Sequence, residues 1–351
     1  MQNLARFWRT LESVPGPAAV VAEWRRLLGP EYDLVRGFLR PCGDLAESYP
    51  CPDPKNVGTA HKVVHHGPDE IVGVCPDGCP PTRLTRADII VWELDRVALD
   101  KAVAEALALH PVPESQADGL PKTTRVGTYV PYADFRFPVF LTVRMEPDEF
   151  RQIADALLAY EESPFILLAP TRDLCSAACE GRLKARKCHF LPLSEALALD
   201  ERGRFALAGN QPIETLLADF RAAVLPPAED RSGMIFFPTP PDARWEDVTI
   251  RFRDGHTVSV NVGGASQVCH YTKMGMADGR NGNPTKQWDL LRDFAEAHGR
   301  FDWSNRKAGR TKQKQRETLA DNLRAFLRIE GDPFVTDGNG WRARFAVSSG
   351  E

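Results

Sequence analysis

The sequence predicts an α+β protein of several domains. The spacing of apolar residues along the 351-residue chain changes between helical and strand-like in separate segments. Two stretches rich in Pro, Gly and polar residues, 111–121 and 226–242, interrupt both kinds of periodicity and are predicted linkers. We therefore expect three domains, which span residues 1–110, 122–225 and 243–351.

Nothing in the sequence indicates a membrane or secreted protein. Its apolar runs are shorter than the ~20 residues that span a bilayer, and its first residues lack the charged-then-apolar order of a signal peptide. We therefore expect a cytoplasmic protein with no membrane partner. In that compartment, eight cysteines indicate metal ligands or reduced thiols rather than disulfides.

The first domain is predicted to begin with helices and to continue as strands and turns. Residues 1–40 place apolar side chains at helical spacing, as at Phe7, Trp8 and Leu11. Residues 41–86 are instead rich in Pro, Gly, Cys and His. A segment with so little apolar content needs another source of stability to fold.

Four cysteines in this segment are the predicted source of that stability, as ligands of one structural zinc ion. The candidate ligands are Cys42, Cys51, Cys75 and Cys79. Cys75-Pro-Asp-Gly-Cys79 is a turn that can present two sulfurs to one ion, and zinc takes four tetrahedral ligands. Eight residues separate Cys42 from Cys51, which is wider than the usual pair. The segment looks like a zinc ribbon, which implies a closed site without catalysis by the metal.

Two alternatives for this segment remain open. The four cysteines are either ordinary reduced thiols, or one of them is replaced in the site by His61, His65 or His66.

Alternating strand and helix patterns predict a small α/β unit in the second domain. The expected elements alternate as strand and helix at residues 137–143, 148–160, 165–170, 174–185 and 189–193. Ser194 is a candidate N-cap for a short helix at 195–199. Near-continuous apolar strands separated by helices are typical of a mostly parallel sheet covered on both faces.

The same unit contains a second group of candidate ligands. These are Cys175, Cys179, Cys188 and His189. A Cys3His metal site is one interpretation, and a thiol-based sensor is another because nearby Arg and Lys side chains favour the thiolate. Free cysteine is often a small buried apolar residue, and core packing is the interpretation that we prefer.

Recognisable catalytic motifs are missing from the sequence. It contains no GxxxxGK[ST] phosphate loop, GxSxG turn or HExxH helix. The turn at 169–171 follows a predicted strand and precedes a helix, so its backbone amides could hold an anion. An enzyme seated in this unit, with Thr171 or His189 near its ligand, therefore remains an alternative.

The third domain concentrates positive charge in an otherwise acidic chain. The whole chain has a net charge of −4, whereas residues 243–351 hold 18 basic and 14 acidic residues. Residues 300–328 alone hold nine Lys or Arg against three acidic residues. Such a region indicates a polyanionic partner, although most charge runs are solvated helix faces.

The predicted elements of this domain follow one another as strands, a helix, a basic helix and a hairpin. The segments are WEDVTIRF and HTVSVNV, a helix from Gln287, a basic helix with Asn322-Leu323-Arg324, and a glycine-aromatic hairpin at 338–345. This pattern resembles the winged-helix effector domain of OmpR/PhoB-type response regulators. The resemblance implies binding to double-stranded DNA. No receiver domain precedes it, so control by phosphorylation is not implied.

The residues expected to contact DNA are all cationic. They are Lys307, Arg310, Lys312, Lys314, Arg316, Arg324, Arg342 and Arg344. The first four lie at the approach to the basic helix, where phosphate contacts set the register. The next two lie on the helix face that would enter the major groove, and the last two alternate outward on the hairpin.

We therefore predict a zinc-containing, DNA-binding protein that acts as a transcriptional regulator. The ribbon or the α/β unit would bind a protein partner or sense a signal. One alternative is an adaptor that uses the winged helix for protein contacts, and the other is the enzyme described above.

Overall fold

The chain forms two compact units, each with helices and strands. The computed structural model describes residues 1–56, 58–67, 70–112, 120, 123–226, 233–302 and 310–350. The first unit combines Met1–Tyr129 with Phe137–Phe220, and the second combines Val130–Arg136 with Arg221–Glu351. The predicted α+β class is confirmed. The predicted domains 1–110 and 122–225 both fall largely within the first unit.

No helix in the described part of the chain is both long enough and apolar enough to cross a bilayer.

The N-terminal part of the first unit is a small helical layer on a three-stranded sheet. The helices are α1 (Ala5–Ser13), α2 (Val21–Leu28) and α3 (Tyr32–Val35), and the strands are β1 (Ala18–Val20), β2 (Leu39–Leu45) and β7 (Ile90–Leu94) in the order β1-β7-β2. Phe7, Trp8 and Leu11 share the buried face of α1, as their spacing predicts. The Trp24 indole N–H donates to the carbonyl of Trp92 at 2.9 Å and so ties α2 to β7.

A four-stranded sheet is inserted between β2 and β7, and we call it the β3–β6 module. Its strands are β3 (Ser48–Pro50), β4 (Ala60–Gly67), β5 (Glu70–Val74) and β6 (Thr82–Leu84), and all neighbours are antiparallel. Its buried apolar cluster consists of Val63, Ile71, Leu84 and Ile89, with Tyr49 packed against it. So small a core buries too little apolar surface to hold four strands together on its own.

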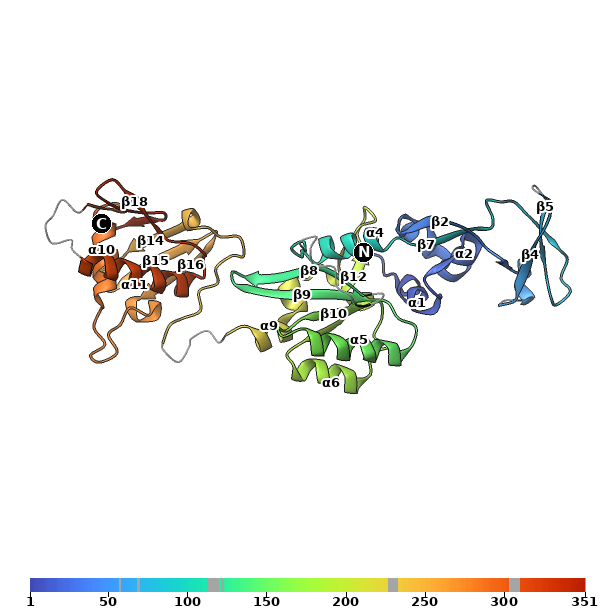
Figure 1. The fold of residues 1–351 in the computed structure, drawn as a ribbon, viewed down its shortest axis with the longest axis horizontal. Coiled ribbons are helices and arrows are strands. Elements are labelled where there is room, and N and C mark those ends of the chain that lie inside the picture. The colour runs from blue at the N-terminus through green and yellow to red at the C-terminus, as the bar shows by residue number, and fades with distance from the viewer. Residues whose placement is uncertain are drawn as a thin grey trace. The chain divides into compact units, whose positions relative to one another are not determined.

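The α/β layer that the alternating pattern predicts makes up the rest of the first unit, except that Val130–Arg136 belongs to the second unit. Its main elements are α4 (Arg96–Ala106), β8 (Thr123–Tyr132), β9 (Phe135–Thr142), α5 (Pro147–Tyr160), β10 (Ile166–Ala169), α6 (Ala177–Ala185) and β11 (His189–Pro192). The sheet order is β11-β10-β9-β8, and β9, β10 and β11 are parallel. Helices α5 and α6 lie together on one face of this sheet (Figure 1).

Short elements follow this sheet, and one of them differs from the prediction. They are α7 (Leu193–Ala196), β12 (Leu197–Leu199), β13 (Phe205–Leu207), α8 (Ile213–Leu216) and α9 (Ala218–Val224). The helix predicted at 195–199 with Ser194 as its N-cap instead begins at Leu193, and Leu197 starts a strand. The prediction was wrong because β12 pairs with β13, and this pairing buries all three residues of β12.

The second unit packs two helices against two sheets. Its elements are β14 (Val248–Phe252), β15 (Thr257–Val262), β16 (Ala265–His270), α10 (Lys286–Glu296), β17 (Arg300–Asp302), α11 (Arg310–Leu327), β18 (Phe334–Asp337), β19 (Gly340–Ala343) and β20 (Ala346–Ser348). The strand orders are β16-β15-β14-β20 and β17-β19-β18. Trp245, Trp288, Phe294 and Phe326 are fully buried in its core. This core is much larger than the apolar cluster of the β3–β6 module.

Candidate metal centre

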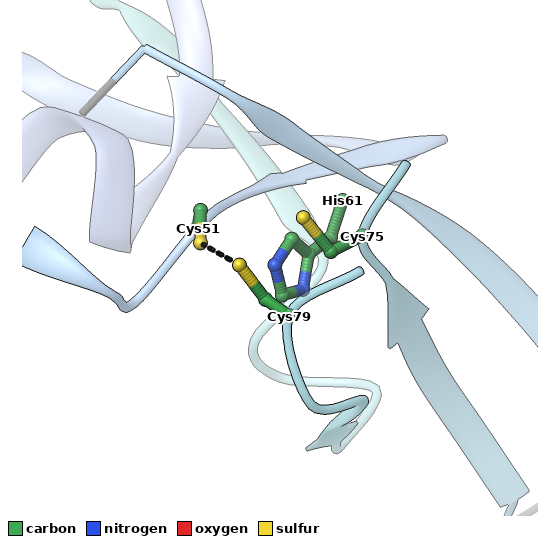
Figure 2. Close-up of side chains that lie close together, drawn as sticks. All are labelled: Cys51, His61, Cys75 and Cys79. Atoms are coloured by element: carbon green, nitrogen blue, oxygen red, sulfur yellow. Dashed lines mark hydrogen bonds between the residues drawn. The ribbon is translucent and has the colours of Figure 1, made fainter. Parts of the chain in front are cut away.

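Four side chains of the β3–β6 module converge on one point. Cys51 follows β3, His61 lies in β4, Cys75 follows β5, and Cys79 ends the turn that Cys75 begins. Their candidate ligand atoms, three sulfurs and one imidazole nitrogen, all lie within 4.8 Å of one another. Figure 2 shows the His61 ring and the three cysteines gathered at this point.

The distance between two of the three sulfurs is that of ligands in a tetrahedral metal site. The Sγ atoms of Cys51 and Cys79 are 3.8 Å apart. In a tetrahedron with Zn–S bonds of about 2.3 Å, two sulfurs are separated by about 3.8 Å. No disulfide joins the described cysteines, so all three sulfurs are available as ligands.

His61 is held with one ring nitrogen free for a metal. The residue is 0% exposed, and its Nδ1 atom lies 3.4 Å from the hydroxyl oxygen of Thr82. Its Nε2 atom is buried and has no hydrogen-bond partner among the described residues. A buried polar atom without a partner is costly, whereas an imidazole whose other nitrogen is hydrogen-bonded is the usual arrangement of a metal-binding histidine.

The turn from Cys75 to Cys79 is shaped to hold sulfur. Gly78 takes a φ of 78°, which favours glycine, and its N–H lies 3.4 Å from the carbonyl oxygen of Cys75. Burial alone would raise the pKa of the Cys75 thiol, but hydrogen bonds from the backbone N–H groups of Cys79 and Asp77 hold that pKa below its ordinary value. The thiolate of Cys75 is thus stabilised by its own turn.

Cys79 has a different environment from Cys75. The hydrogen bond shared with Cys75, together with burial, raises the pKa of Cys79 to about 11. The side-chain amide of Asn56 lies 2.6 Å from the Cys79 sulfur and opposes this shift by donating to it. A metal ion that binds here therefore displaces a proton from Cys79.

Three of the four predicted ligands lie in this group, and Cys42 does not. The Cys42 sulfur lies in β2, 3.4 Å from the carbonyl oxygen of Val91. His61 takes the fourth position, which is the alternative that the sequence left open. The sequence feature that could have identified His61 is its alternation with Val63, since both side chains point to the buried side of β4. His65 and His66 are exposed and are not part of the group.

The cysteines of the second group are buried in the apolar core. Cys175, Cys179 and Cys188 are buried in the apolar cluster beneath α5 and α6. Burial raises the pKa of each thiol, that of Cys175 to about 12. His189 lies beside the Phe220 ring, with 6.0 Å between the ring centroids. Within the described residues these side chains form no metal-binding group, which fits the preferred interpretation of core packing.

The predicted anion-binding turn after β10 holds a carboxylate of the chain itself. The backbone N–H and the hydroxyl of Thr171 donate to the Glu12 carboxylate at 3.0 and 2.5 Å. Glu12 lies in α1, so this contact fastens the first helix to the sheet.

The predicted DNA-binding residues are for the most part paired with acidic side chains of the second unit. Lys307 lies outside the described residues, and of Arg310 only its place at the start of α11 is described. The ion pairs are Lys312–Asp293 at 3.3 Å, Arg342–Asp337 at 3.5 Å, Arg344–Glu246 at 2.8 Å, and the close pairs Arg316–Asp332 and Arg324–Asp321. Lys314 is exposed and has no ion-pair partner in the described part of the chain.

Comparison of the chain with protein-family models, with curated proteins and with solved structures found no match. Its function is therefore inferred from the geometry of its own residues.

Proposed function

We propose that Cys51, His61, Cys75 and Cys79 bind one structural zinc ion, as in a zinc ribbon. The observation that carries this proposal is the convergence of four ligand atoms within 4.8 Å, with two sulfurs 3.8 Å apart. Three thiolates and one imidazole form a ligand set that zinc favours over hard cations such as Mg²⁺ or Ca²⁺.

The role of the ion is to hold the β3–β6 module in one conformation. All four ligand positions are filled by side chains, so no position is left for a water molecule or a substrate, and the metal performs no catalysis. The ion links the ends of β3 and β5 to the start of β4. It thereby supplies the stability that the small apolar cluster of the module lacks.

Cobalt substitution tests this proposal. Metal-free protein is titrated with Co²⁺, and we expect one equivalent to produce sulfur-to-cobalt charge-transfer absorption and the visible bands of a tetrahedral site. Zn²⁺ should then abolish these bands. A spectrum of octahedral Co²⁺, without charge transfer from sulfur, would rule out the thiolate site.

A second candidate function is binding of double-stranded DNA by the second unit. Its elements α10, β17, α11, β18 and β19 share with a winged helix the order helix, strand, helix and hairpin, with one helix among the described residues between β17 and β18 where a winged helix has two. Strands β17, β19 and β18 form one sheet. The Arg342 side chain is 55% exposed on the β18–β19 hairpin. This order favours the proposal, but five of the expected cations must first leave their carboxylate partners.

The exposed face of α11 carries mixed charge, which favours the adaptor alternative. Lys314, Glu317 and Asp321 are exposed along this helix. Acidic side chains at the phosphate backbone oppose DNA binding, whereas a protein partner can match both signs of charge.

Fluorescence anisotropy with a random DNA duplex at two salt concentrations separates DNA binding from the adaptor function. Affinity that falls steeply with salt supports DNA binding, and the absence of binding at low salt leaves the adaptor.

A further inference from the structure

We propose that the metal centre is a redox sensor, in which oxidation joins Cys51 to Cys79 and releases the zinc ion. This inference rests on the proposed zinc site. It adds a specific pair of sulfurs, an order of attack and an oxidant, which is a peroxide.

The four ligands differ in exposure, and this difference selects the reactive pair. His61 is 0% exposed and Cys75 is 7% exposed, whereas Cys51 and Cys79 are only partly buried. The 3.8 Å between the sulfurs of Cys51 and Cys79 is close enough for one to attack the other after small side-chain rotations.

A cavity gives a small oxidant access to Cys51. It has a volume of about 350 Å³, and its lining includes Cys51, Tyr49, Thr59 and Ala60 beside Glu23 of α2. Hydrogen peroxide is much smaller than this cavity. Cys51 is therefore the ligand that a peroxide from solvent meets first.

Hydrogen bonding distinguishes the two partly buried sulfurs. The side-chain amide of Asn56 donates to the Cys79 sulfur at 2.6 Å. A donor draws electron density from a sulfur, so this contact lowers the nucleophilicity of Cys79. Together with the cavity beside Cys51, it favours Cys51 as the sulfur that attacks the peroxide.

The reaction balances with peroxide as the two-electron oxidant. The Cys51 thiolate attacks one peroxide oxygen, forms an S–O bond and expels hydroxide. The Cys79 thiolate then attacks the Cys51 sulfur, forms the S–S bond and expels the second hydroxide. Two protons convert the hydroxides to water. The zinc ion keeps only Cys75 and His61 as ligands and dissociates.

Loss of the ion removes the main support of the β3–β6 module. A chemical signal in solution thereby becomes a change in the shape of the module, which is how a partner would sense it.

The test uses the zinc-loaded full chain treated with hydrogen peroxide. A colorimetric chelator follows zinc release, and non-reducing peptide mapping identifies the disulfide. We expect release of one zinc ion per chain together with a Cys51–Cys79 disulfide, and recovery of zinc binding after dithiothreitol and added zinc. Asn56→Ala, which removes the donor to Cys79, should release zinc several-fold faster. Cys42→Ser, which alters a thiol outside the site, should release it at the wild-type rate.

Two outcomes would contradict the redox sensor, and a third would contradict the zinc site on which it depends. A protein that keeps its zinc in peroxide, or one whose first disulfide includes Cys75, is not the sensor described here. A purified chain that binds no zinc from the start overturns the proposed zinc site itself, and that result is distinct from a peroxide-resistant site.

Discussion

The His61 ring packs against Gly73, which lies on the neighbouring strand. A Cβ atom at residue 73 would lie 3.2 Å from both the Cβ and the Nδ1 atoms of His61, and 3.4 Å from a methyl group of Leu84. The first two contacts are tighter than ordinary van der Waals contact. A side chain at this position would therefore displace the His61 ring from its present position beside the three sulfurs.

Substitution of this glycine should weaken metal binding without removing a ligand. We expect Gly73→Val to lower zinc affinity by roughly tenfold or more, as loss of a supporting contact around a metal commonly does. Competition with a chromophoric chelator measures the affinity. Gly67→Val is the matched control, since a Cβ at residue 67 meets nothing within 4 Å. Equal affinities for the two variants would mean that the His61 ring position is unimportant for binding.

Removal of the metal should unfold the β3–β6 module and leave the second unit intact. We expect trypsin to cleave after Lys62 and Arg83 when a chelator is present, because the apolar cluster of the module is too small to protect these strands. Cleavage after Arg251, in a strand of the large second core, should not change. Mass spectrometry of the fragments follows both sites. An identical pattern with and without chelator would show that the module folds without the ion.

The contact between Glu12 and Thr171 should make stability depend on pH. Burial raises the pKa of Glu12 above its ordinary value of 4.5, although hydrogen bonds from Thr171 lower it. As pH rises above 4.5, the unfolded chain loses this proton while the folded chain keeps it. The contribution of Glu12 to the free energy of unfolding therefore falls with rising pH through this window, and levels off above the folded pKa.

Glu12→Gln should remove this contribution from the pH dependence of stability, because the amide does not titrate. Urea denaturation between pH 4 and pH 8 measures it. Glu162→Gln, at an exposed position, is the matched control and should keep the wild-type dependence. A Glu12→Gln variant with the wild-type slope would assign the pH dependence to another group.

The ion pairs of α11 predict that its two lysines contribute unequally to any DNA binding. Lys312 is paired with Asp293, so its contribution to phosphate binding is reduced by that contact, whereas Lys314 is unpaired within the described residues. We expect Lys314→Ala to weaken duplex binding and its salt dependence more than Lys312→Ala does. Salt-dependent anisotropy titrations compare the two. A larger effect at Lys312 would contradict the ion-pair assignment.

Periodicity predicted the elements well where local packing decides them. The buried strand at 165–170 and the helix at 148–160 correspond closely to β10 and α5. The helix expected at 195–199 failed because a partner strand at 205–207 outweighs the local pattern. Such pairing depends on how a turn returns the chain, which apolar spacing alone does not reveal.

The metal centre could be predicted only in part, because one pair of ligands is close in the sequence and the others are brought together by folding. The pair Cys75 and Cys79 is local, since one turn brings both sulfurs together, and its spacing was informative. The choice between Cys42 and His61 depends on how β2 and β4 lie in space. The spacing of eight residues between Cys42 and Cys51 was wider than the usual pair, but it did not indicate that His61 takes the place of Cys42.

Local composition could not predict ion pairs between residues that are far apart in the sequence. Arg344 pairs with Glu246, which is 98 residues away. The count of basic residues in 300–328 predicted a basic surface, but folding placed carboxylates beside several of them. Composition therefore overestimated the free positive charge of the second unit.

The zinc content of three purified variants tests the metal centre most directly. Elemental analysis should find one zinc ion per chain in Cys42→Ser, as in the wild type, and little or none in His61→Ala. His61→Cys, which restores a fourth thiolate, should bind zinc again. Loss of zinc in Cys42→Ser together with its retention in His61→Ala would contradict the assignment of Cys51, His61, Cys75 and Cys79 as the ligands.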